Sequence, residues 1–115
     1  MRGAMVTFAV VADSHFHPPG VPTQAVWHSD RFFNDRNRVA AAMLARARPA
    51  FGVHLGDIPH PVPGLPEHAE ALTVARETYA KLPFPLYMVP GNHDVGDKPH
   101  PWAPAPSVSD AKHQT

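Results

Sequence analysis

The chain has 115 residues, 43% of them hydrophobic, so the sequence predicts a globular body of one domain at most. Ten basic residues balance ten acidic ones, and this balance gives no field that would attract a nucleic acid or an anionic membrane. The absence of cysteine excludes disulfides, zinc–thiolate sites and thiol nucleophiles, so any metal must be held by nitrogen and oxygen ligands. No stretch approaches the roughly 20 apolar residues of a membrane span, and we expect a cytoplasmic protein.

The first half of the chain predicts a strand, a loop and a helix. Residues 5–12 are a continuous apolar run, too short for a helix, that suits a strand buried on both faces. The prolines within residues 15–29 forbid regular structure there, so a long loop is expected. Over residues 30–48 the alanine-rich composition and the spacing of the apolar residues predict a helix, which Pro49 ends.

The second half repeats this alternation. Residues 50–55 are another short apolar run and predict a second strand. Residues 66–82 open with a proline and acidic residues, which favour a helix start, and they carry apolar residues on one side. Residues 85–90 predict a third strand.

Strands that alternate with helices at this spacing predict an α/β fold with parallel strands joined by right-handed crossovers. In such sheets, ligands bind beyond the carboxyl ends of the strands. Three polar clusters fall at those ends, so we expect them to converge on one edge of the sheet. They are Asp13-Ser14-His15, Gly56-Asp57 and Gly91-Asn92-His93-Asp94.

The clusters combine carboxylates, imidazoles and a carboxamide without a thiolate, a donor set that suits Mn, Fe, Zn or Ni. One ion could use three of these groups. Two ions about 3.5–4 Å apart need a bridging ligand, and the carboxylate of Asp57 in the middle cluster is the natural candidate. Taken singly, the aspartates could cap strands, His15 could be a surface histidine and Asn92 a turn residue. Because three such clusters occur in order along the chain, each after an apolar run, a metal site is favoured over coincidence.

These clusters resemble the first three signature blocks of the calcineurin-like metallophosphoesterases, over residues 5–97. The resemblance implies that Asp13 and His15 hold a first metal ion. It implies that Asp57 bridges both ions and that Asn92 holds the second. His93 would face the substrate and assist the leaving group.

The resemblance further implies a hydrolase of phosphomonoesters or phosphodiesters, with a dinuclear site of two divalent ions such as Mn, Fe or Zn. A metal-bound hydroxide would attack phosphorus. The substrate would be a small-molecule or nucleotide phosphoester. His93, whose ordinary pKa is about 6.5, could donate a proton to the departing alkoxide. Asp94 is a candidate to contact the ligand residues and orient them without binding the ion itself.

Two departures from the family pattern are visible in the sequence. In much of the family the second block is Gly-Asp-x-x-Asp, whose second acid orients the leaving-group histidine, but here His60 stands at that position. Either another group orients His93, or its acid assistance is weaker; His60 is itself a candidate supporting residue. The later Gly-His and Gly-His-x-His blocks are absent from the sequence, and neither His100 nor His113 sits in such a motif.

The resemblance therefore predicts a β-α-β-α-β half of an αββα sandwich in residues 1–96, with a mostly parallel sheet. Residues 97–115 would be a proline-rich irregular tail leading to a missing C-terminal half. An uncovered sheet face predicts poor solubility, self-association or a missing remainder, and we favour a truncated chain. The alternative function is a truncated, catalytically inactive metal-binding or interaction fragment.

Overall fold

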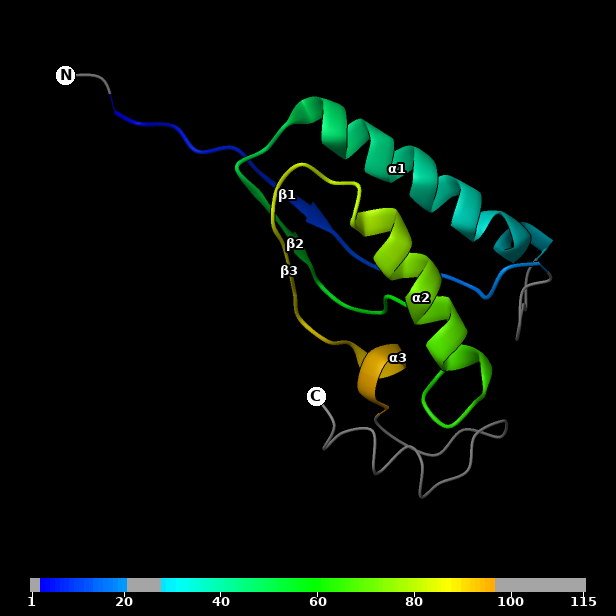
Figure 1. The fold of residues 1–115 in the computed structure, drawn as a ribbon. Helices are drawn as coiled ribbons and strands as arrows, with labels where there is room; N and C mark the ends of the chain where they lie inside the picture. Colours follow the sequence, from blue (N-terminus) through cyan, green and yellow to red (C-terminus); the bar gives the residue numbers. More distant parts are fainter. Residues whose placement is uncertain (1–2, 21–27, 97–115) are drawn as a thin grey trace.

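The computed structural model describes residues 3–20 and 28–96 of the chain. In this part, strands alternate with helices in the predicted order (Figure 1). The elements are strand β1 (Phe8–Val11), 3-10 helix η1 (His28–Phe32), helix α1 (Phe33–Ala47), strand β2 (Phe51–His54), helix α2 (Glu67–Tyr79), strand β3 (Leu86–Met88) and the short helix α3 (Asn92–Val95).

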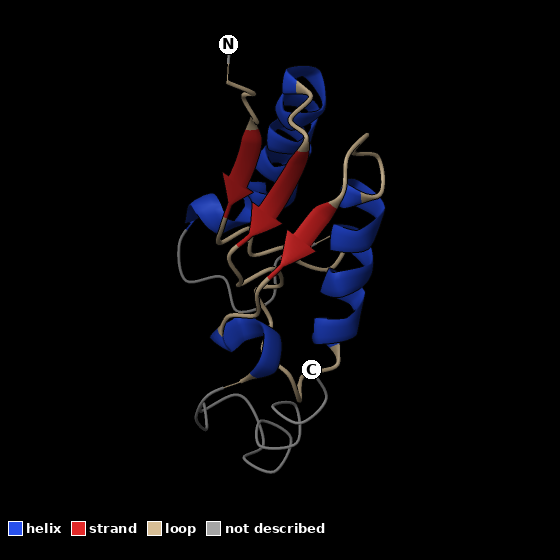
Figure 2. Cartoon of the chain, turned by 90° about the vertical axis from the view of Figure 1, so that its left-hand side faces the viewer, coloured by secondary structure: helices blue, strands red, loops and turns tan. Residues whose placement is uncertain are grey.

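The strands form one parallel sheet in the order β1-β2-β3. Helix α1 connects β1 to β2 and helix α2 connects β2 to β3, and both helices lie on the same side of the sheet (Figures 1 and 2). All three strands point toward the edge at which α3 lies (Figure 2). The predicted α/β fold with a parallel sheet is therefore confirmed.

The helices follow the predicted pattern with small differences at their ends. The first turn of the predicted helix, residues 30–32, is part of η1. Helix α1 ends before Pro49 with Arg48 in the left-handed conformation, and the Arg48 N–H donates to the carbonyl of Leu44 at 3.2 Å. Helix α2 begins directly after Pro66, whose fixed φ suits a helix start. The core lies beneath α2 and consists of Phe16, Ile58, Val74 and Ala75, with Leu72 and Tyr79 packed against them.

The prediction that the first strand is buried on both faces is wrong. Phe8 is 55% exposed and Val10 is 52% exposed, because the helices cover the other face and none of the described residues covers this one (Figure 2). The strand register places Phe51 and Tyr87 on the same open face. The ring of Phe51 contacts those of Phe8 and Tyr87, with centroids 5.4 and 6.2 Å apart. The open face is therefore an apolar surface.

None of the helices in residues 3–20 and 28–96 has the length and hydropathy needed to cross a membrane. The predicted tail, residues 97–115, lies outside the described residues together with His100 and His113. The division of the chain at residue 96 and the cytoplasmic location stay predictions.

Candidate metal centre

The segments that follow β1 and β2 run side by side beyond the sheet. The N–H of Asp13 donates to the carbonyl of Gly56 at 3.0 Å, and the N–H of His15 donates to the carbonyl of Asp57 at 3.1 Å. The same ladder continues to Phe16, whose side chain is fully buried in the core. Backbone bonds and the core therefore hold both polar clusters at the carboxyl edge of the sheet.

Asp13, His15 and Asp57 share an uncommon backbone conformation, with φ values of 55°, 46° and 57°. Residues other than glycine rarely adopt this left-handed region, which costs on the order of 1–3 kcal/mol for each residue. The one further non-glycine residue with positive φ in the described part is Arg48, the end of α1. Strain at three predicted ligands is the pattern expected where a backbone is held for function.

The side chains of these three residues converge. His15 Nε2 lies 3.6 Å from Asp13 Oδ1 and 3.9 Å from Asp57 Oδ2. One ligand atom from each of the three lies within 4.8 Å of the other two. Two carboxylates and an imidazole without a thiolate fit Mn, Fe or Zn, so the residues present fit the ion that the sequence predicts.

Burial keeps the His15 imidazole available as a ligand. Desolvation lowers the pKa of His15, and the neighbouring His93 lowers it further. The carboxylates of Asp57 and Asp13 raise the pKa, but they do not outweigh burial. The ring is therefore neutral near neutral pH, which is the form that binds a metal ion.

Residues at the start of α3 hold the carboxylate of Asp57 in place. The N–H of His93 donates to Asp57 Oδ1 at 3.0 Å. A Cβ at Gly91 would lie 2.4 Å from the same oxygen, and a Cβ at Gly56 would lie 2.5 Å from the Gly91 nitrogen. The segment after β2 and the start of α3 therefore approach each other too closely for a side chain at either position, and this requires both glycines in addition to any need for a turn. Asn92, the fourth predicted ligand, is the first residue of α3 and lies between the two residues that contact Asp57.

The carboxylate of Asp94 accepts three backbone hydrogen bonds. Its Oδ2 accepts from the N–H of Asp57 at 2.7 Å and of Gly91 at 2.6 Å, and its Oδ1 accepts from the N–H of Ile58 at 3.0 Å. Asp94 therefore joins the segment after β2 to the start of α3 and fixes the backbone of the predicted bridging residue.

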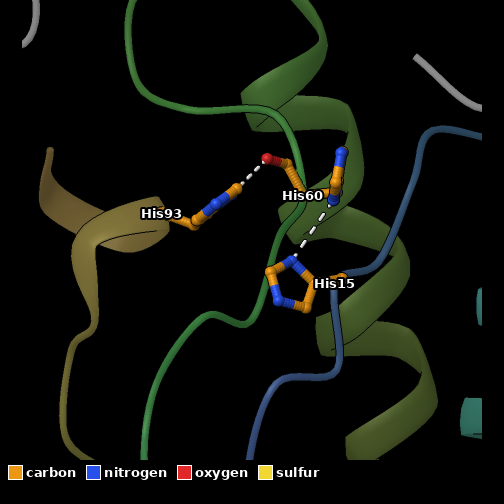
Figure 3. A group of neighbouring side chains, drawn as sticks. All are labelled: His15, His60 and His93. Carbon is orange, nitrogen blue, oxygen red and sulfur yellow. Dashed lines mark hydrogen bonds between the residues drawn. The ribbon is translucent and has the colours of Figure 1, made fainter. Parts of the chain in front are cut away.

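The ring of His93 points at the main chain of His60 (Figure 3). His93 Nδ1 is hydrogen-bonded to the carbonyl oxygen of His60. Because a carbonyl can only accept, Nδ1 carries the proton, and Nε2 is the atom with the lone pair in the neutral ring. Where the resemblance leads one to expect an acid, the main-chain carbonyl of His60 contacts His93. Sequence reasoning missed this group, because every residue has a carbonyl and only the fold decides where it points.

Sequence reasoning also missed His54, which is fully buried at the end of β2. His54 Nδ1 accepts the N–H of Gly56 at 3.0 Å, and its Nε2 is hydrogen-bonded to the hydroxyl of Ser14. The Ser14 hydroxyl lies 2.6 Å from the hydroxyl of Tyr79. Burial lowers the pKa of His54 and raises that of Tyr79, so both rings stay uncharged. This network supports the Asp13-Ser14-His15 cluster from the helix-covered side.

Comparison with solved structures shows a fold similar to that of a dimetal phosphatase from Danio rerio. The TM-score is 0.60 over 79% of the present chain at 23% sequence identity, and the present chain spans 30% of the length of that protein. None of the curated proteins matches the chain. The model of the calcineurin-like phosphoesterase family matches residues 6–113, nearly the whole sequence, and this confirms the resemblance that the three clusters carry. The chain therefore belongs to the calcineurin-like phosphoesterase family.

Proposed function

We propose that this site hydrolyses phosphomonoesters or phosphodiesters with the help of two divalent ions. The observation that carries the proposal is the convergence of Asp13, His15 and Asp57, whose ligand atoms lie within 4.8 Å of one another. Asp13 and His15 would hold one ion, Asp57 would bridge, and Asn92 would hold the other. When bound, such ions neutralise phosphate oxygens and lower the pKa of the attacking water toward neutrality.

His93 would donate a proton to the leaving oxygen from its Nε2. Its Nδ1–H donates to the carbonyl of His60, so the ring keeps one orientation and one tautomer. The backbone N–H of His93 also donates to Asp57 Oδ1, which ties the proton donor to the bridging carboxylate.

The proposed substrate is a small-molecule or nucleotide phosphoester. The balance of ten acidic and ten basic residues gives the chain no net positive charge that would attract a polyanion. A compact phosphoester can be bound through its reacting phosphate group, which the bound ions and His93 would contact.

Hydrolysis of bis(4-nitrophenyl) phosphate with Mn²⁺ tests this function. We expect the Asp57→Asn variant to lose at least about 100-fold in kcat/KM, because the bridging charge is removed. The His93→Asn variant should lose about 100-fold in kcat through the missing proton donor. Asp35→Asn is the matched control, since Asp35 is an exposed carboxylate of α1 paired with Arg38 at 2.6 Å. An unchanged rate in Asp57→Asn would overturn the bridging role.

A second function, a non-catalytic metal-binding or interaction fragment, is favoured by two observations. The sequence lacks the Gly-His and Gly-His-x-His blocks that the resemblance leads one to expect, and one sheet face is apolar and open. Calorimetric titration of the 115-residue chain with Mn²⁺ separates the two functions. Two tight sites would contradict the fragment, whereas one weak site without phosphoester turnover would support it.

A further inference from the structure

Three imidazoles meet beside the carboxylates of the candidate metal centre. We propose that His15, His60 and His93 form a second, nitrogen-only site for a borderline divalent ion such as Zn²⁺, which shares His15 with the carboxylate site. One ring nitrogen from each of the three lies within 4.8 Å of the other two (Figure 3). The rings come from the segments after β1 and β2 and from α3, so the fold itself brings them together.

The spacing of two of these nitrogens is that of ligands on one ion. His60 Nδ1 lies 3.3 Å from His15 Nδ1. In a tetrahedral site with zinc–nitrogen bonds of about 2.0–2.1 Å, neighbouring ligand atoms stand about 3.3–3.4 Å apart. The two rings can therefore exchange their shared hydrogen bond for an ion with little movement of either nitrogen.

The third ring is already oriented as metal-binding histidines are. His93 Nδ1 donates to the carbonyl of His60, and a ligating histidine usually gives its second N–H to a carbonyl or a carboxylate. This hydrogen bond fixes the tautomer and leaves the lone pair of His93 on Nε2. The ring of His93 stands edge-on to that of His15, with centroids 4.8 Å apart.

The His60 ring is held in place by its surroundings. It packs against the ring of His17, with centroids 4.6 Å apart and planes inclined by 30°. The N–H of His60 donates to the carbonyl of Phe16 at 2.8 Å, which fixes its backbone beside the segment that carries His15. Rings that are oriented before the ion arrives lose little freedom on binding it, which favours affinity.

The carboxylate group (Asp13, His15 and Asp57) and the imidazole group (His15, His60 and His93) share the ring of His15. His15 presents Nε2 to Asp13 and Asp57 and presents Nδ1 to His60. Imidazole donors suit Zn, Cu or Ni, whereas the carboxylate-rich group also suits Mn, so the two groups differ in the ions they favour. An ion on the three imidazoles would occupy Nε2 of His93 and so compete with proton donation by that ring, a consequence that rests on the proposed function.

Zinc binding measured without any substrate tests the site. The experiment uses the 115-residue chain with Asp57→Asn, which disables the carboxylate group and leaves the three histidines. Calorimetry should give one Zn²⁺ per chain, and Co²⁺ in its place should give the visible absorption of a tetrahedral ion. Adding His60→Phe should weaken binding at least about tenfold, because the ring against His17 is kept but its nitrogen is removed.

The matched control is His68→Ala in the same Asp57→Asn background. His68 is hydrogen-bonded to the carbonyl of Pro61 and takes no part in the cluster, so Zn²⁺ affinity should stay within about twofold. His93→Phe gives a second test of the cluster, and circular dichroism of each variant verifies that it is folded. Equal Zn²⁺ affinity with and without His60→Phe, or no binding to Asp57→Asn, would overturn the proposal. Failure of the proposed hydrolysis would be seen only in the phosphoester assay and leaves this measurement unaffected.

Discussion

The carboxylate of Asp94 accepts the backbone N–H of Asp57 at 2.7 Å, although the two residues are 37 positions apart in the chain. It also accepts the N–H of Gly91 and of Ile58. One side chain therefore fixes the geometry between the end of β2 and the start of α3. Because Asp57 is the predicted bridging ligand, this contact links the stability of the fold to the geometry of the site.

Asp94→Asn should lower the free energy of unfolding by about 2 kcal/mol, since hydrogen bonds to a charged group contribute about 1.5–3 kcal/mol. One amide oxygen cannot accept all three backbone N–H groups, and the amide nitrogen would face donors. Urea unfolding followed by circular dichroism measures the change. The control Asp35→Asn removes an exposed ion pair and should cost less than about 1 kcal/mol. Equal losses in the two variants would show that the three hydrogen bonds of Asp94 contribute little.

Gly91→Ala should destabilise the chain by about 1–3 kcal/mol and weaken Mn²⁺ binding. The new Cβ would lie 2.4 Å from Asp57 Oδ1 and 2.8 Å from the Asp57 nitrogen, so the backbone or the carboxylate must move. Gly52→Ala is the control, because its Cβ would meet the flexible end of Leu86 at 2.9 Å. Unfolding and Mn²⁺ calorimetry on both variants check this. A Gly91→Ala protein with wild-type Mn²⁺ affinity would contradict the close approach.

Stability should fall as the pH drops below about 6.5. Burial lowers the pKa of His54, so the unfolded chain binds a proton at a higher pH than the folded chain does. The stabilising contribution is thus complete above the unfolded pKa and is lost as the pH falls toward the folded pKa. The geometry agrees with this direction, because His54 Nδ1 accepts the N–H of Gly56 and a protonated ring would place two donors face to face.

The free energy of unfolding measured between pH 5 and pH 8 checks this prediction. His54→Gln removes the titrating group and should flatten the dependence, at some cost in overall stability. His68→Gln is the matched control, since it removes a histidine at the start of α2 that is hydrogen-bonded to the carbonyl of Pro61 and takes no part in this network. An equally steep profile in His54→Gln would assign the acid sensitivity to other groups.

The open sheet face should limit solubility. Replacing Val10 and Tyr87 by Thr should raise the saturation concentration, because both side chains lie on the apolar face and Thr keeps a strand preference. Val39→Gln with Met43→Gln is the control, since these residues are as exposed but lie on α1. Ultracentrifugation of both variants gives the soluble concentration. Equal gains from the two pairs would show that general surface hydrophobicity, not this face, limits solubility.

Local patterns in the sequence were sufficient for the order of the elements. Apolar runs too short for helices became β1, β2 and β3, and prolines marked the end of α1 and the start of α2. Because parallel strands end at one edge, the order alone also predicted which clusters would meet. Asp13, His15 and Asp57 do meet there, although their roles in binding ions stay predictions.

The sequence by itself therefore determined the α/β order, the family and the edge at which the polar clusters lie, because these depend on periodicity and spacing along the chain. Only the tertiary structure decided which face of the sheet is covered, and it left Phe8 and Val10 exposed. It also decided that the carbonyl of His60 contacts His93 and that Asp94 contacts the backbone of Asp57. These contacts join segments more than 30 residues apart, and the direction in which a carbonyl or a carboxylate points depends on how the segments pack.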